Sequence, residues 1–357
     1  MDRSAASAYV YAKASGMLAK SYVGSRAEKL FSVKSLRELY GLLFDDEVPA
    51  IPESMLAKLI ETKAQDRFIS QYMGLLENYS SPDEVLIMLL RSYEYENLKE
   101  IGAALCYKEN KMPVLADIGK YAQIAYKYWP DLAAMTANSS VSWYNKPPVS
   151  TEQQAIDQRL DLQYIAQLWQ SAKKLPASEC ALVQDFVRKE IIYQNIMWAL
   201  RLKVFYKYDA ERIARMLVYE NSGVIAGGMG KTTAVSSGKP DRTDSFARDA
   251  LSVLEKETDS WEQWSGWKYA SFLNPHEEGV VWEVDPCWLE NMMRRDLNLQ
   301  ALRSFHKNPD TAMSLFSWFK IKQNELGYIR SVAEGLRLNV GADEILTAAG
   351  ATVSPVK

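Results

Sequence analysis

Apolar residues recur at helical spacing along almost the whole chain. One series follows Ser81-Pro82-Asp83-Glu84, in which Ser81 is the predicted N-cap and Pro82 the first helical residue. The apolar positions behind it are mostly three or four residues apart, as on one face of a helix: Val85, Leu86, Leu89, Tyr93, Leu98, Ile101 and Leu105.

A second long series begins at Asn308-Pro309-Asp310 and is predicted to run to about Gly335, roughly 40 Å at 1.5 Å per residue. A third helix start, Ser150-Thr151-Glu152-Gln153, follows the break at Lys146-Pro147-Pro148. Because alternating strand patterns are nearly absent, we predict an all-α protein.

The sequence also contains a weak internal repeat. Tyr95-Glu96-Asn97-Leu98-Lys99 is echoed by Tyr193-Gln194-Asn195-Ile196-Met197, and more faintly by Leu326-Gly327-Tyr328-Ile329-Arg330. Units about 100 and 130 residues apart indicate three related helical domains, which we place at residues 1–125, 126–220 and 221–357. The third domain is expected to begin with a loop at about 221–244, which is rich in glycine, serine and threonine.

Composition narrows the class of protein. Hydrophobic residues make up 48% and charged residues 24% of the chain, which is ordinary for a folded soluble protein. The net charge of −3 gives no basic signal, so nucleic acid is not an expected partner. Since no apolar run approaches the about 18–20 residues of a transmembrane helix, any membrane contact is expected to be peripheral.

The usual signatures of catalytic and metal sites are missing. His276 and His306 are the two histidines, and neither belongs to an HExxH or a Cys-His cluster. Carboxylates are plentiful, but no pair of them stands out as an acid/base couple. We therefore nominate no catalytic residue, no metal ligand and no cofactor-binding residue.

One segment imitates a nucleotide-binding loop. Gly227-Gly228-Met229-Gly230-Lys231-Thr232-Thr233 is similar to the KGGxGK[ST] loop of deviant Walker ATPases, whose backbone N–H groups surround phosphates. Against this interpretation, Ala226 replaces the signature lysine, and no Walker B strand or α/β alternation follows. A P-loop ATPase of this kind remains the alternative hypothesis, and it predicts an α/β fold.

Several motifs resemble one family, the C subunit of V-type (A/V-type) ATPases, which is called subunit d in eukaryotes. The resemblance covers nearly the full length, from Tyr9-Val10-Tyr11-Ala12-Lys13 to the last long helix. Tyr328 departs from it, because the family usually has Asn there, and so does Ile192, where Asp is common. The motif positions carried over from the family are Asn97, Leu98, Asp161, Tyr164, Asn195, Ile196, Arg201, Glu325, Ile329 and Arg330.

The resemblance implies three similar helical domains arranged as a pseudo-threefold funnel. It also implies a non-catalytic subunit of the central stalk, on the cytoplasmic side of the cell membrane. Its partners would be the proteolipid ring and the central-shaft subunits D and F, so that ATP hydrolysis or synthesis is linked to H⁺ or Na⁺ transport. The ion, the direction of the reaction, the residues that contact shaft and ring, and the role of the 221–244 loop are left open by the sequence.

Overall fold

The computed structural model describes residues 2–220, 241–277 and 279–350. These residues contain α-helices and short 3-10 helices, and they contain no β-strand. The prediction of an all-α protein is therefore confirmed. The glycine-rich run from Gly227 to Thr233 lies outside the described residues, and within them there is none of the sheet that the P-loop alternative requires.

Six long helices form three consecutive helical hairpins, each made of two antiparallel helices joined by a short or moderate connection. The hairpins consist of α4 (Glu53–Leu76) with α5 (Glu84–Cys106), α7 (Gln153–Ala172) with α8 (Ala177–Val204), and α12 (Pro286–Lys307) with α13 (Ala312–Arg337).

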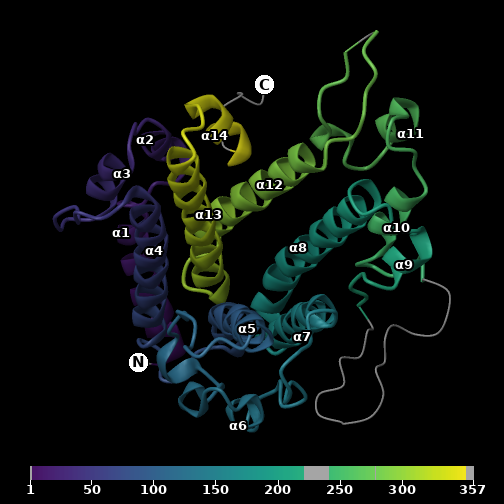
Figure 1. Ribbon diagram of the computed structural model, residues 1–357. Coiled ribbons are helices and arrows are strands. Elements are labelled where there is room, and N and C mark those ends of the chain that lie inside the picture. The colour runs from purple at the N-terminus through teal and green to yellow at the C-terminus, as the bar shows by residue number, and fades with distance from the viewer. Residues whose placement is uncertain (1, 221–240, 278, 351–357) are drawn as a thin grey trace.

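The three hairpins contact one another in a closed ring. The second helix of each hairpin packs on the first helix of the next, so that α5 contacts α7 and α8 contacts α12. The last hairpin returns to the first, because α13 packs along α4 (Figure 1). A pseudo-threefold relation between the hairpins, a funnel outline and the three domain boundaries stay predictions.

Shorter helices surround this ring. In Figure 1, α9 to α11 lie beside the far ends of α8 and α12, whereas α2, α3 and α14 lie around the end of α13 and α4. The remaining α-helices are α1 (Arg3–Leu18), α2 (Glu28–Phe31), α3 (Leu36–Leu43), α6 (Leu132–Thr136), α9 (Ala210–Ala214), α10 (Arg248–Leu254), α11 (Trp261–Ser265) and α14 (Ala342–Ala348). The 3-10 helices are η1 (Gly24–Ala27), η2 (Gly119–Tyr121), η3 (Tyr126–Tyr128) and η4 (Ala270–Phe272).

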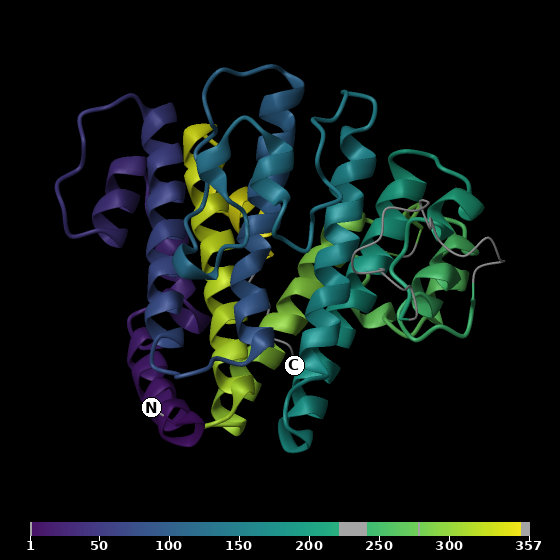
Figure 2. The same cartoon turned by 90° about the horizontal axis from the view of Figure 1, so that it is seen from below.

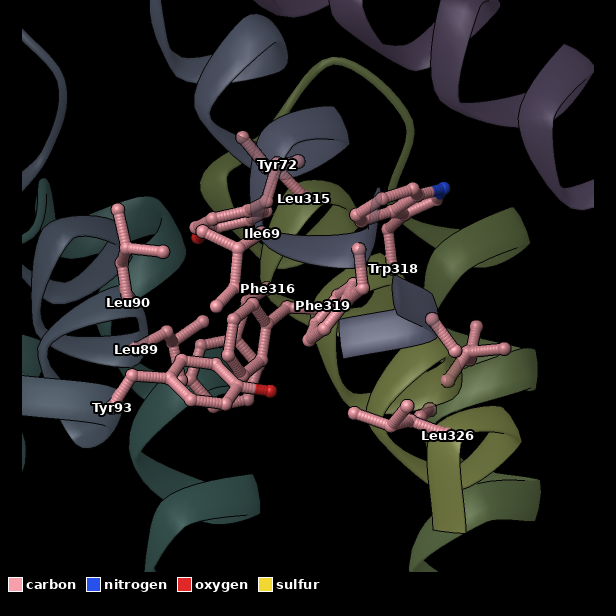
Figure 3. Packing of buried hydrophobic residues seen from close by; sticks show 14 of the residues in the cluster. Ile69, Tyr72, Leu89, Leu90, Tyr93, Leu315, Phe316, Trp318, Phe319 and Leu326 are labelled. Atoms are coloured by element: carbon pink, nitrogen blue, oxygen red, sulfur yellow. The ribbon is translucent and has the colours of Figure 1, made fainter. Parts of the chain in front are cut away.

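The main apolar core lies where α4, α5 and α13 meet, and it joins the two ends of the sequence. Figure 3 shows Tyr72 of α4 beside Phe316, Trp318 and Phe319 of α13. The Tyr72 ring lies 4.8 Å from that of Phe319 and 6.1 Å from that of Trp318, and all three are fully buried. Burial of one such side chain contributes about 2–3 kcal/mol, so this cluster holds the first and third hairpins together.

Two helices begin later than the sequence predicts. The first, α5, begins at Glu84 with Asp83 at the N-cap position, instead of at Pro82 after Ser81. The carboxylate of Asp83 makes no cap bond, because it accepts hydrogen bonds from Arg3. Similarly, α13 begins at Ala312 and not at Pro309, since Asp310 takes a left-handed conformation with φ of 60°.

The long helices run side by side over most of the height of the molecule (Figure 2). With 26 residues, α13 is about 39 Å long, close to the length predicted from its apolar spacing. One face of α13 is buried in the main core from Ala312 to Ala333, and α13 also contacts α14. Other positions in the middle of α13, such as Gln323, Gly327 and Arg330, are exposed.

Candidate functional site

A hollow of about 920 Å³ opens between α4, α5, α7, α8 and α13. The hollow does not extend to the first turns of α5, α8 and α13. The first lining residues on these helices are Ser92, Val187 and Lys320, about two to three turns from the respective helix starts. Leu326 contributes to both the hollow and the apolar core shown in Figure 3, so the core lies directly under the lining.

Carboxylates outnumber cations in the lining of this hollow. Its cationic members are Lys58, Lys320 and Arg330, three against seven carboxylates. The carboxylates are Glu61, Asp66, Glu96, Glu100, Glu109, Asp161 and Glu190.

Three of these carboxylates have cationic partners. Lys99 of α5 contacts Glu96 at 2.9 Å and Asp161 of α7 at 2.6 Å, which ties the first hairpin to the second. Lys320 of α13 contacts Glu190 of α8 at 2.6 Å, which ties the third hairpin to the second. These pairs brace the wall of the hollow.

The other four carboxylates, Glu61, Asp66, Glu100 and Glu109, have no cation within ion-pair distance among the described residues. Burial raises the pKa of Glu61, and the charge of Glu334 raises it further, against the opposing effect of nearby cations. Burial also raises the pKa of Asp66. An anionic wall of this kind attracts a partner that brings its own positive charge.

A second hollow of about 400 Å³ adjoins the first and lies between α8, α12 and α13. Both hollows are lined by Lys320, Gln323, Gly327 and Arg330, which form one stripe at helical spacing along the middle of α13. In Figure 1, α12 and α8 both run from the region of α13 toward α9 to α11. The stretch of α13 from Lys320 to Arg330 is therefore accessible from both hollows.

Two of the predicted motif positions, Asn97 and Asn195, fix the segments that follow their helices. Asn97 of α5 accepts a hydrogen bond from the N–H of Ala116 at 2.9 Å and donates one to its C=O at 2.8 Å. Asn195 of α8 does the same with Val218, at 2.9 and 2.8 Å. Both side chains are buried, so the sequence echo marks two equivalent structural contacts.

The remaining motif positions are divided between the lining, the core and separate ion pairs. Asp161, Tyr164 and Arg330 line the hollow together with Asn97. Leu98, Ile196 and Ile329 are buried in three different apolar clusters.

Arg201 of α8 pairs with Glu290 of α12. Glu325 pairs with Lys322 and accepts a hydrogen bond from the N–H of Tyr22 at 2.5 Å. The ten motif positions therefore do not converge on one point.

Comparison with known proteins decides the family. Residues 7–222 match the family described as ATP synthase (C/AC39) subunit. The chain belongs to this family. It is also 29% identical over 334 residues to an uncharacterized protein of Treponema pallidum (strain Nichols), and this similarity covers 94% of the chain and 93% of that protein.

The structure of this C/AC39 family member also contains a polar network that the sequence did not reveal. Arg3 of α1 contacts Asp83 at the start of α5, at 3.0 Å, and Glu179 in the first turn of α8, at 2.6 Å. Glu179 in turn accepts a hydrogen bond from the N–H of Ala312, the first residue of α13, at 2.7 Å. One network thus joins α1 to a helix of each hairpin.

Nothing in the sequence near Arg3 or Glu179 indicated this pairing, because the two residues are 176 positions apart. The four unpaired carboxylates of the hollow were also missed. Glu61, Asp66 and Glu100 are on helices that carry charges on several faces, and Glu109 follows the end of α5. Which of these charges line a hollow depends on the packing of other hairpins.

Described residues of this family member offer few other sites. They contain no group of three or more His, Cys, Asp or Glu side chains that could hold a metal ion. None of the helices in this part of the chain is both long and apolar enough to cross a membrane. The acidic hollow is therefore the candidate site that the fold positions most clearly.

Proposed function

We propose that this chain is the non-catalytic central-stalk subunit that couples the central shaft of a rotary V-type ATPase to the proteolipid ring. In this role one end of the molecule rests on the cytoplasmic face of the ring. The hollow inside the hairpin ring receives the end of the shaft formed by subunits D and F. Torque then passes between ATP hydrolysis or synthesis in the catalytic head and H⁺ or Na⁺ transport in the membrane.

The observation that carries this proposal is an open, polar hollow inside a closed ring of long helices, in a chain of the C/AC39 family. A coupling subunit must hold its partner without chemical reaction, so a recess lined with charged side chains suits it better than a large apolar patch.

The ring is also suited to carrying torque. A rotational load on one hairpin passes to the next through helix packing, and two ion pairs in the wall reinforce these contacts: Lys99–Asp161 and Lys320–Glu190. At the other end of the helices, Arg3 and Glu179 connect all three hairpins through Asp83 and the N–H of Ala312. Long packed helices deform little under such a load, because close-packed interiors have low compressibility.

Co-purification tests the proposal directly. The tagged full-length chain is isolated from its native membranes, and the proteins that accompany it are identified by mass spectrometry. We expect recovery of the proteolipid and of subunits D and F. Clean recovery of the chain without any V-type ATPase subunit would overturn the proposal.

Charge reversal in the hollow adds a site-specific test. Because Glu61 and Glu100 are unpaired lining residues, the double variant Glu61→Lys/Glu100→Lys should lose subunits D and F while keeping the helical circular-dichroism spectrum. Glu262→Lys on α11, an exposed residue outside the hollow, is the matched control and should retain both subunits. Equal recovery from the two variants would place the shaft contact elsewhere.

A further inference from the structure

Gly327 occupies an unusual position in the middle of α13. It is exposed, it lines both hollows, and it lies ten residues before the end of a 26-residue helix. A methyl group built on it would meet no atom within 4 Å. Glycine at such a position weakens a helix relative to alanine, and the internal packing of the described residues does not require it.

The other helical glycines differ from Gly327 in what surrounds them. A Cβ on Gly102 of α5 would lie 2.1 Å from the hydroxyl oxygen of Tyr144, so that glycine is required by internal packing. Gly16, Gly41 and Gly74 also face open space, but none of them lines either hollow. Gly327 fits neither case.

The surroundings of Gly327 suit a close-packed helical partner. Gln323 and Arg330 lie about one turn to either side of it, and both are exposed in the hollow. Without a side chain at Gly327, a partner helix can approach α13 to the short end of the 8–10 Å range of helix separations. Gly327, where α13 has no side chain, therefore lies within the stretch of α13 that lines both hollows.

The charge of the larger hollow, the acidic one of the two that Gly327 lines, specifies the partner further. Glu61 and Asp66 on α4 and Glu100 on α5 belong to the wall that α13 shares, and none of the three is in an ion pair within the described part of the chain. A partner that packed on Gly327 without positive charge would leave these carboxylates desolvated and unpaired, which is costly. A basic partner would compensate them.

We infer that the occupant of the hollow is an α-helical end rich in lysine or arginine, which makes its closest approach to this chain at Gly327 of α13. This inference rests on the proposed function, in which the occupant is the end of the shaft. It adds the chemistry of the contacting segment and names the position on α13 that sets how closely the segment can approach.

The test compares Gly327→Ala and Gly327→Leu with the wild-type chain in binding to the purified D–F shaft complex. Both variants should fold, with denaturant midpoints at or above the wild-type value, because the added side chain enters open space and favours the helix. Affinity for the shaft should fall several-fold for Gly327→Ala and about tenfold or more for Gly327→Leu, since the added atoms overpack a close contact.

Gly16→Leu on α1 is the matched control, because Gly16 is exposed and also faces open space. It should leave shaft affinity unchanged. If the wild-type chain binds the shaft and Gly327→Leu binds as tightly as Gly16→Leu, the inference is wrong while the proposed function stands. If the wild-type chain does not bind the shaft at all, the proposed function itself fails.

The positive charge of the proposed partner is tested by a separate measurement, the salt dependence of shaft binding. Replacing Glu61 and Glu100 with glutamine should weaken binding and make the affinity less sensitive to salt, because fewer charges are paired across the interface. An unchanged salt dependence would show that the shaft end does not bring positive charge to this wall.

Discussion

Asn97 and Asn195 lie in different hairpins and make the same two hydrogen bonds to the backbone. Each amide accepts from the N–H and donates to the C=O of one residue in the segment that follows its helix, Ala116 or Val218. Tyr328, at the equivalent position in the third echo, instead packs edge-on against Phe31 with 5.6 Å between ring centroids. The internal repeat thus has a physical basis in two of its three copies.

Removal of either asparagine side chain should destabilise the protein. Asn97→Ala or Asn195→Ala leaves a buried N–H and a buried C=O without partners, so we expect a loss of about 1–3 kcal/mol in the free energy of unfolding. Denaturant unfolding followed by circular dichroism measures it. Asn291→Ala, which removes a hydrogen bond from an incompletely buried residue, should cost less than about 1 kcal/mol. Equal losses at all three positions would contradict the structural role of the repeat.

Acid stability should depend on Glu179. Burial by itself would raise the pKa of this carboxyl, but the hydrogen bonds from Arg3 and Ala312 and the charge of Arg3 lower it below its ordinary value of 4.5. A carboxyl with a lowered pKa in the folded state stabilises the fold above pH 4.5. This contribution is lost as the pH falls through the folded-state pKa.

Glu179→Gln should therefore cost about 2 kcal/mol at pH 7, because charged hydrogen bonds are replaced by neutral ones. The difference between variant and wild type should shrink as the pH falls below 4.5, and unfolding curves at a series of pH values measure this. Glu28→Gln changes an exposed carboxylate outside the network and is the control. A constant difference between Glu179→Gln and wild type across the pH series would refute the linkage.

Gly102 should be intolerant of any side chain. Alanine there would place Cβ 2.1 Å from the hydroxyl oxygen of buried Tyr144, so Gly102→Ala should destabilise the fold by about 1–3 kcal/mol despite its better helix propensity. The clash is with an oxygen that has no hydrogen-bond partner. Adding Tyr144→Phe removes that oxygen and should restore much of the lost stability in a thermal-unfolding comparison. A double variant no more stable than Gly102→Ala would show that another contact excludes the methyl group.

Local pattern was sufficient to predict the helices but not their exact starts. The apolar series behind Ser81 is buried almost as predicted, because a single helix face determines it. The helix α5 starts at Glu84 instead of Pro82 because Asp83 binds Arg3, a residue 80 positions away. Distant contacts of this kind leave no periodic signal in the sequence.

In the candidate site, too, local pattern predicted some residues and contacts between distant segments determined others. Asn97 and Asn195 could be singled out because the echo repeats them, and their buried contacts explain why. The unpaired carboxylate of Glu61 could not be singled out from the sequence. It becomes part of the wall of the hollow only when α13 of the last hairpin packs on α4 of the first. Sequence reasoning therefore reached the fold class and the family, but not the residues that line the hollow.

The return of α13 to α4 also constrains how the chain matures on the ribosome. The partners meet across the roughly 240 residues between Leu76 and Ala312, which take about 10–50 s to synthesise at 5–20 residues per second. During that interval the apolar face of α4, with Ile69 and Tyr72, lacks the helix that covers it. Nascent first hairpins are thus natural clients for chaperones, and the ring can close only after almost the whole chain has emerged.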